Sequence, residues 1–464
     1  MKLEIKKGSE GYVASIVQID NLHPIEGADF IQRTVIYGNN VIIGKDIKEG
    51  DVMLYFNSGT KLNPEFCKAN NLYSNQEYNA DPTAKKGYLS YKQSRVKAIK
   101  LRNIISDGFL LPITSLYYVT KTSNIVDLKV GDTFTTLDDV DICEKYIVTP
   151  PRNGNPGGHK PAVNKFNRIV ENQFYLHNDT ENLRRNIHKI NPNDIIGIHY
   201  KKHGTSAVFA NIPTKRPLKW YEKLLQKLGV KIDDIVYDII YSSRNVIKNK
   251  HINPETGSGF YGEDVWGVVA KEIKDLIPKN WTLYGEIVGY LPSGAPIQKN
   301  YDYGCIPESL DEQYKSGHNT YQEKPQHKFY VYKISIVNPN GKVIYLTDKQ
   351  IEEYCEKVGL LYKDTFIYYG TIDGIFESKN FIDWDLLDKT ITRDTWQETL
   401  LDYLEYKYNE KDCYMSTNKV PEEGIVLRIE KLESYEAYKL KSKRFVLMES
   451  EAQEKEEINI EDEQ

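Results

Sequence analysis

The feature that most constrains this chain is a lysine placed where an apolar strand enters a tight turn. The segment reads Gly197-Ile-His-Tyr-Lys201-Lys-His-Gly204-Thr-Ser206, with strand-like residues at 195–200 before the turn and at 207–209 after it. The alternating pattern predicts two strands, and the His-Gly pair predicts the turn between them. A lysine in this place faces either a pocket or, if the segment is a surface hairpin, solvent.

A lysine amine that has lost its proton is a nucleophile. Partial burial and neighbouring cations favour the neutral amine, which can attack phosphorus and form a covalent phosphoramidate. Lys201 is therefore a candidate nucleophile, with Lys202 as the alternative that the sequence leaves open.

A second charged hairpin is predicted near the carboxyl end. Pro421-Glu-Glu423-Gly-Ile-Val and Tyr435-Glu-Ala-Tyr-Lys439-Leu-Lys441 read as two short strands joined by a polar turn. Lys439 and Lys441 are two residues apart, so they share a strand face and can reach one anion. Glu423 beside two lysines and a phosphate is suited to Mg²⁺. The same pattern also fits a solvated hairpin.

Three further candidates lie between these hairpins. Arg244, in Tyr-Ser-Ser-Arg-Asn, can offer a guanidinium fork to a ribose or phosphate, or can be solvated. Glu286 is a carboxylate within an apolar strand, which is costly unless it is paired. Tyr332 belongs to an aromatic strand over 328–336, where a ring either stacks on a purine base or packs in the core.

Taken in order, these residues resemble the motifs of the covalent nucleotidyltransferase superfamily of ATP-dependent ligases and capping enzymes. The six matching motifs are Lys201-x-His-Gly204, Ser243-Arg244, Tyr284-Gly-Glu286, the strand with Tyr332, Glu423-Gly-Ile-Val426 and Lys439-x-Lys441. The resemblance implies a lysyl-AMP on Lys201 and Glu423 and Glu286 as metal ligands. It also implies nucleotide contacts for His203, Gly204, Arg244, Glu286, Tyr332, Lys439 and Lys441.

The histidine at position 203 resembles the RNA ligase branch, because DNA ligases usually have aspartate there. Many relatives carry an OB fold after the last lysine motif, but here only a short acidic stretch follows Met448. Short strands separated by turn residues, between Gly11 and about Tyr118, instead predict an amino-terminal β-barrel. This region resembles the OB domain of the type-five nick-sealing RNA ligases.

A basic stretch within the predicted barrel is interleaved with tyrosines. Such a pattern suits a phosphate backbone and stacked bases, and it equally fits a solvated face of a structural barrel. Its members are Lys85, Lys86, Tyr88, Tyr91, Lys92, Arg95, Lys97, Lys100 and Arg102.

The fold class that follows is α+β, in four regions. An OB-like barrel is expected over 1–120, a linker over 121–164, an ATP-grasp-like adenylylation domain of antiparallel sheets with flanking helices over 165–447, and a disordered acidic tail over 448–464. Gly and Pro residues at 148–161 favour an irregular linker. Helical spacing predicts helices at 219–229 and 264–276 that flank the catalytic sheet.

Composition agrees with an intracellular protein. No apolar run is long enough to cross a membrane, and the first residues, Met1 to Lys7, lack the apolar stretch of a signal peptide. The five cysteines show no disulfide or zinc spacing, so a reducing cytoplasmic location is expected. The net charge is −5, but residues 449–464 carry −7, which leaves +2 for the rest. The body of the protein is therefore not repelled by nucleic acid.

The resemblance implies an ATP-dependent RNA ligase that uses Mg²⁺ or Mn²⁺ and joins 3′-OH and 5′-phosphate ends. Its expected partner is nicked or broken RNA, including RNA/DNA hybrids, in RNA repair. A DNA ligase or capping-type guanylyltransferase is the first alternative, and a non-catalytic nucleic-acid-binding protein is the second. The sequence indicates no oligomeric state.

Overall fold

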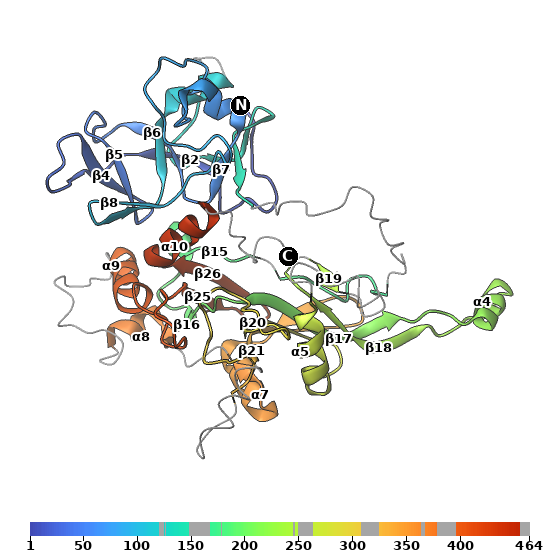
Figure 1. Cartoon of the computed structure of the whole chain (residues 1–464). Helices are drawn as coiled ribbons and strands as arrows, with labels where there is room; N and C mark the ends of the chain where they lie inside the picture. Colours follow the sequence, from blue (N-terminus) through green and yellow to red (C-terminus); the bar gives the residue numbers. More distant parts are fainter. Residues whose placement is uncertain are drawn as a thin grey trace. The chain divides into compact units, whose positions relative to one another are not determined.

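The computed structural model divides the chain into two compact units (Figure 1). It describes residues 1–119, 125, 127–147, 168–177, 179–244, 246–248, 263–307, 324–362, 367–377 and 396–454. The first unit consists of Met1–Thr149, Glu181–Ile187 and Lys441–Asn459, and the second of Pro150–Thr180, His188–Leu440 and Ile460–Gln464. None of the described helices combines the length and apolar character needed to span a bilayer.

The first unit is built from short antiparallel strands, as its sequence predicts. One sheet has the order β10 (Phe109–Pro112), β6 (Val52–Phe56), β2 (Ala14–Gln18) and β11 (Thr133–Phe134). A second has the order β3 (His23–Pro24), β4 (Ile31–Ile36) and β5 (Asn39–Gly44). The remaining elements are β1 (Leu3–Glu4), β7 (Thr60–Leu62), α1 (Pro64–Ala69), β8 (Ile99–Leu101), β9 (Ile104–Ser106), β12 (Thr136–Leu137), β13 (Val140–Asp141), β14 (Cys143–Lys145), β15 (Glu181–Asn182), α3 (Leu183–Asn186) and 3₁₀ turns at Gln76–Tyr78 and Ile113–Tyr118.

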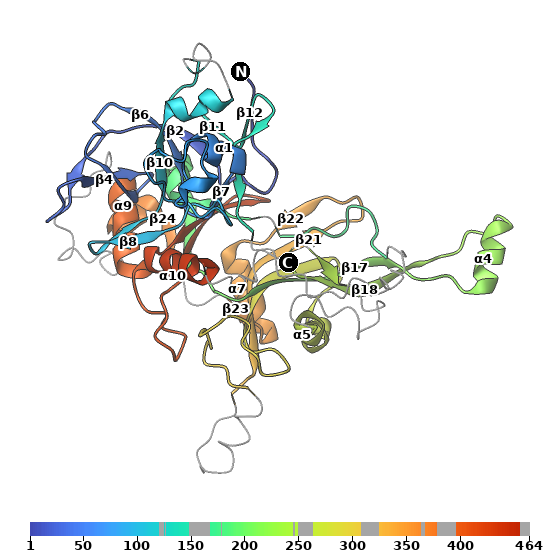
Figure 2. The ribbon, with the colours of Figure 1, turned by 45° about the horizontal axis from the view of Figure 1, so that its top comes forward.

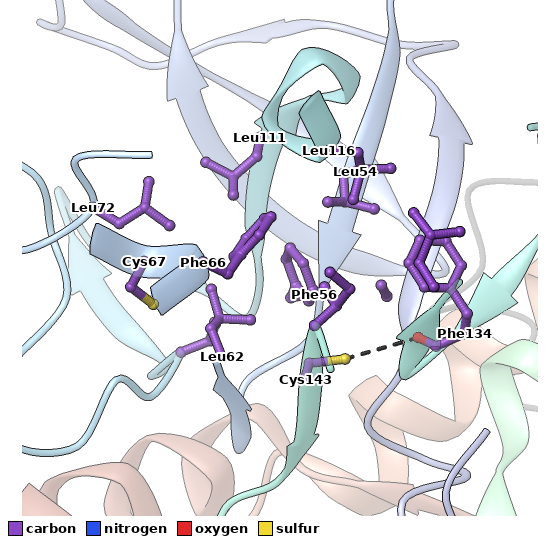
Figure 3. Close-up of a cluster of buried hydrophobic side chains, with 14 of the residues drawn as sticks. Leu54, Phe56, Leu62, Phe66, Cys67, Leu72, Leu111, Leu116, Phe134 and Cys143 are labelled. Atoms are coloured by element: carbon purple, nitrogen blue, oxygen red, sulfur yellow. Dashed lines mark hydrogen bonds between the residues drawn. The ribbon is translucent and has the colours of Figure 1, made fainter. Parts of the chain in front are cut away.

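The core of this unit is filled by side chains that alternate along the strands. Leu54 and Phe56 of β6 point inward against Phe66 of α1 and Phe134 of β11, and all four are fully buried (Figure 3). The Cys143 thiol donates to the Phe134 carbonyl at 3.8 Å. Burying these aromatic and aliphatic groups is the main force that holds the short strands together.

The predicted linker over 121–164 is wrong in its first part. Residues 133–145 form β11 to β14, of which β11, β12 and β14 pair with β2, β1 and β7 of the first unit, and β13 pairs with β12. Strands of two or three residues are too short to show a periodic pattern, so only their distant partners reveal them. The Gly- and Pro-rich stretch at 148–161 lies outside the described residues.

The predicted disordered tail is wrong up to residue 454. Helix α10 (Lys443–Glu454) packs within the first unit, where the Arg95 guanidinium, 3% exposed, donates to the Gln453 side chain at 2.6 Å and to the Ser450 carbonyl at 3.1 Å. Lys97 pairs with Glu454. Contacts of Arg95 and Lys97 thus hold the last turns of a helix that the acidic composition after Met448 did not predict. Residues 455–464 lie outside the described range.

The second unit contains two antiparallel sheets that follow the predicted motifs. The larger has the order β19 (Ile247–Lys248), β18 (Ile235–Ser242), β17 (Thr205–Lys215), β20 (Trp281–Gly289), β21 (His327–Val337) and β22 (Val343–Tyr345), with β23 (Leu361–Tyr362) beside β21. The smaller contains, in order, β26 (Tyr435–Lys441), β25 (Gly424–Glu430), β16 (Ile195–Tyr200) and β24 (Tyr368–Thr371). Its helices are α5 (Val265–Ile273), α7 (Asp348–Val358), α8 (Ile372–Glu377) and α9 (Trp396–Leu404), with 3₁₀ turns at Ile187–Lys189 and Lys274–Leu276 and a π-helix at Glu405–Asn409.

The two predicted helices form, but only one flanks the sheet. Val265, Trp266 and Val269 of α5 are buried in the core of the larger sheet. Helix α4 (Trp220–Lys227) instead lies at the far end of the β17–β18 hairpin, as both views show (Figures 1 and 2). None of its residues is buried, and Trp220 is 78% exposed. The two strands continue beyond the sheet and carry α4 away from it, which the helical spacing could not indicate.

Candidate active site

A pocket in the second unit is lined from both of its sheets. It gathers the ends of strands that are far apart in sequence, so the motifs meet only in the folded chain. The lining residues are His177, Asp179, Thr180, His199, Tyr200, Lys201, Lys202, Ser206, Arg244, Glu286, Tyr330, Tyr332, Lys333, Val426, Arg428, Tyr435, Ala437 and Lys439.

Lys201 follows the last residue of β16 and enters this pocket beside Glu423. Its backbone N–H donates to the Gly424 carbonyl at 2.8 Å, which fixes the start of the turn. Its Nζ lies 2.6 Å from Oε1 of Glu423, whose side chain is fully buried. The sequence placed Glu423 beside the two carboxyl-terminal lysines, whereas the strand pairing β16–β25 sets it against the candidate nucleophile.

His203 and Gly204 shape the turn rather than line the pocket. The His203 N–H donates to the Tyr303 hydroxyl at 2.6 Å, and its Nδ1 lies 3.6 Å from Oε2 of Glu423. A Cβ at Gly204 would stand 2.3 Å from the Ile287 carbonyl oxygen. Glycine is thus needed for the turn to approach β20. The nucleotide contacts predicted for His203 and Gly204 stay predictions.

Two of the predicted phosphate-binding cations meet on one carboxylate. Arg244 Nη2 lies 2.8 Å from Asp179 Oδ2, and Lys439 Nζ lies 3.0 Å from Oδ1 of the same residue. Asp179 was missed in the sequence because no motif surrounds it. Lys441, the other predicted lysine, pairs with Glu449 of α10 at 3.1 Å and is not among the pocket-lining residues.

Asp179 occupies a place that an anion of the substrate could take. We expect Asp179→Asn to strengthen nucleotide binding about 3- to 10-fold, because the half-exposed carboxylate competes weakly for Arg244 and Lys439. The measurement is the Kd for ATP in calorimetry. Weaker binding in the variant would mean that Asp179 positions the two cations instead of competing for them.

Glu286 and Tyr332 face the pocket from neighbouring strands. Glu286 on β20 is opposite Ser206 on β17, and the Ser206 hydroxyl lies 3.3 Å from the Tyr332 hydroxyl. Burial, and secondarily the Glu286 carboxylate, raises the pKa of Tyr332, so its ring stays neutral. Burial and the cations Lys333 and Arg244 hold the pKa of His177, whose ring is 5.2 Å from that of Tyr332, well below its usual value.

A buried polar network that the sequence did not reveal lies at the wall of the pocket that the smaller sheet forms. Arg428 of β25, 2% exposed, lies 3.2 Å from Asp348 and 3.3 Å from Glu430. His199 Nε2 lies 2.9 Å from the other Asp348 oxygen. The charges largely compensate one another, which is the condition for burying them. The only sequence signal was an arginine at an inward-facing strand position.

Comparisons with known proteins agree with this geometry. A family model described as an OB-fold domain matches residues 13–113, and one described as RNA ligase matches residues 197–443, more than half of the chain. The chain belongs to the RNA ligase family. A comparison with curated protein sequences gives no match.

Solved structures of an RNA ligase from Naegleria gruberi share the fold of this family member. A mutant of that enzyme with AMP and Mn has 16% identity and a TM-score of 0.51, covering 93% of this chain and 97% of that one. A mutant with ATP and Mn has 16% identity and a TM-score of 0.52, with coverages of 93% and 98%. The form with PPi has 17% identity and a TM-score of 0.52, with coverages of 94% and 98%.

The RNA ligase pocket offers oxygen donors for a hard cation. No cluster of three or more metal-ligating side chains occurs among the described residues. Mg²⁺ nevertheless needs only one or two carboxylates when water and phosphate oxygens supply its other ligands. The buried carboxylates of Glu423 and Glu286 fit that requirement.

Proposed function

We propose that this RNA ligase is ATP-dependent and seals nicks in RNA through a lysyl-AMP intermediate on Lys201. The observation that carries the proposal is the amine of Lys201 beside the buried Glu423, in a pocket that also holds Arg244, Lys439 and Tyr332. A nucleophile, cations for phosphate and an aromatic ring for a base are the groups that nucleotidyl transfer needs. The ATP and AMP complexes of the Naegleria enzyme support the choice of nucleotide.

The proposed reaction has three balanced transfers. Nζ of Lys201 attacks the α-phosphorus, a P–N bond forms, and the bond to pyrophosphate breaks. An oxygen of the RNA 5′-phosphate then attacks the same phosphorus and frees the lysine, which leaves AMP joined to the RNA end. Finally, the 3′-hydroxyl attacks the 5′-phosphate, forms the phosphodiester and expels AMP. All three develop charge on phosphate oxygens, so positioned cations accelerate them.

The lining residues divide these tasks. Lys439 and Arg244 would neutralise phosphate oxygens once Asp179 releases them, and Tyr332 would stack on the base. The nucleotide contact expected of Lys441, which pairs with Glu449, stays a prediction. Glu286 would hold the ribose. A divalent cation held by Glu423 and Glu286 would add charge compensation at the α-phosphate.

The first unit offers a surface for the RNA. The rings of Tyr78 and Tyr91 stack at 3.7 Å with an angle of 6° between their planes, and Tyr88 is 70% exposed. Exposed Lys85, Lys86 and Lys92 accompany them. Aromatic faces among lysines suit stacked bases and a phosphate backbone, whereas Arg95 of the same basic stretch is covered by α10.

A ligation assay with matched nicked substrates tests the proposal. We expect the purified protein with ATP and Mg²⁺ to seal a nick with 3′-OH and 5′-phosphate ends in duplex RNA. Rates with RNA/DNA hybrids and all-DNA duplexes define the strand preference, and a nick lacking the 5′-phosphate is the control. Sealing of the all-DNA duplex alone would contradict the proposal that RNA is the substrate. Labelling of the protein by GTP alone would favour a guanylyltransferase.

A further inference from the structure

A bulge in β21 turns Lys333 toward the pocket. Tyr284 and Gly285 are adjacent on β20, yet they pair with Lys333 and Val331, so Tyr332 is the extra residue on β21. Beyond the bulge the side-chain alternation is reversed. A Cβ at Gly285 would lie 2.4 Å from both the Phe329 ring and the Tyr330 carbonyl oxygen, so only glycine fits at this point of the strand pair. Without the bulge, Lys333 would point into the core on the other face.

Lys333 is buried among aromatic rings and has no carboxylate partner among the described residues. It is 4% exposed, and its Nζ lies 3.6 Å from the centre of the Tyr284 ring and 5.6 and 5.9 Å from those of Tyr345 and Tyr435. Arg428, which also stacks on Tyr435, is compensated by Asp348 and Glu430. Ring faces only partly replace the water that a buried ammonium loses.

We propose that Lys333 is a base-specificity residue, whose Nζ donates a hydrogen bond to an acceptor nitrogen of the adenine ring. This inference rests on the proposed binding of ATP in the pocket. An unpaired donor that is more than nine-tenths buried and lines a ligand pocket gains a partner only when a ligand arrives. A ligand without an acceptor there leaves it unpaired and binds less well.

The surroundings favour a base rather than a phosphate. The cations Lys201, Arg244 and Lys439, which are proposed to act on phosphate, are all paired with carboxylates. Lys333 instead lies among tyrosines and next to Tyr332 in sequence, the ring proposed to stack on the base. A planar, weakly hydrated heterocycle fits such walls better than a strongly hydrated phosphate.

Direct binding measurements on a Lys201→Ala background test the inference, because that variant cannot consume ATP. We expect Lys333→Met to weaken ATP binding about 10- to 100-fold at pH 6, where the amine carries its proton, as loss of a charged hydrogen bond does. Each of 1-deaza-, 3-deaza- and 7-deaza-ATP lacks one acceptor nitrogen of the base. One of them should bind more weakly than ATP to the background protein, and as tightly as ATP to the protein that also carries Lys333→Met. Lys333→Arg should retain part of the affinity.

A matched control is Lys248→Met. Lys248 also lies over a ring, 4.4 Å from the centre of Trp266, but does not line the pocket, so its loss should leave the preference among the analogues unchanged. Equal ATP affinity in Lys333→Met and the background would overturn the inference. An affinity loss in Lys333→Met that is the same for ATP and all three analogues would overturn it as well. Absence of both ATP binding and covalent labelling in wild type would instead overturn the proposed function on which this inference rests.

Unfolding temperatures without nucleotide separate folding from binding. Burial, with a smaller effect of Arg428, lowers the pKa of Lys333 from 10.5 to about 7. The folded state therefore binds fewer protons between these values, and its stability falls as pH falls through that window. Titratable or charged groups that also line this region are His177, Glu286, Arg428, Tyr284, Tyr332, Tyr345 and Tyr435. Without nucleotide, Lys333→Met should unfold at a higher temperature than wild type at pH 6, and the difference should be smaller at pH 9. Added ATP should raise the unfolding temperature of Lys333→Met less than that of wild type.

Discussion

Replacing Lys201 with alanine is expected to abolish the covalent labelling of the protein by ATP carrying a labelled α-phosphate, by a factor of about 10³ or more. The alanine removes the only atom that forms the P–N bond. Lys201→Arg should fail equally, because a guanidinium keeps its proton and is a poor nucleophile. The measurement is a denaturing gel after incubation with labelled ATP and Mg²⁺.

Lys202→Ala is the matched control for this experiment. Lys202 is adjacent in sequence and lines the same pocket. The two amines differ in their surroundings, because Nζ of Lys201 lies 2.6 Å from the Glu423 carboxylate, whereas Nζ of Lys202 lies 5.6 Å from the centre of the Tyr330 ring. Labelling should therefore persist in Lys202→Ala. Labelling lost with Lys202→Ala and kept with Lys201→Ala would reverse the assignment. If wild-type protein is labelled only after treatment with pyrophosphate, the protein was already adenylated when it was purified.

The second large effect is expected from Arg428→Met, which should lower the free energy of unfolding by about 3–5 kcal/mol. The substitution leaves the carboxylates of Asp348 and Glu430 buried without their arginine. An uncompensated buried charge costs far more than the lost contacts themselves. Denaturant titration followed by tryptophan fluorescence, with equal slopes for both proteins, measures the difference.

An exposed arginine provides the comparison. Arg216 contacts both oxygens of Glu222 near α4, at 2.8 and 2.7 Å, but its side chain is 30% exposed. Arg216→Met should therefore lower the free energy of unfolding far less than Arg428→Met does. In Arg428→Met, replacing Asp348 with Asn and Glu430 with Gln should recover part of the loss. An equal, small effect at both arginines would mean that water or another cation compensates the buried carboxylates.

Much of the candidate site could be predicted from residue order and local spacing. The turn after β16, the hairpin of β25 and β26 and the strand with Tyr332 form where the alternation of side chains predicts them. These features depend on neighbours within a few residues, so local sequence carries them. The structure gathers Lys201, Arg244, Glu286, Tyr332 and Lys439 in one pocket, with Glu423 behind Lys201. Their individual roles remain predictions for the experiments above.

Other parts of the site depend on pairings between distant segments. Asp179 reaches Arg244 and Lys439 from a stretch without a motif, and Arg428 meets Asp348 across 80 residues of sequence. The end of helix α10 is held by Arg95, which donates to Gln453, and by Lys97, which pairs with Glu454. Strands β11, β12 and β14 pair with β2, β1 and β7, each more than 80 residues away in sequence. No local pattern contains such information.

The family, the order of the motifs and the residue types suited to nucleotidyl transfer could all be inferred from the order of residues along the chain. Which charges meet and which side chains face the pocket depend on how distant segments pair in the folded chain. Lys333 shows the reason most clearly, because one extra residue in β21 reverses the alternation and moves this amine from the core face to the pocket face. Register is a property of two paired strands, so it cannot be read from either strand alone.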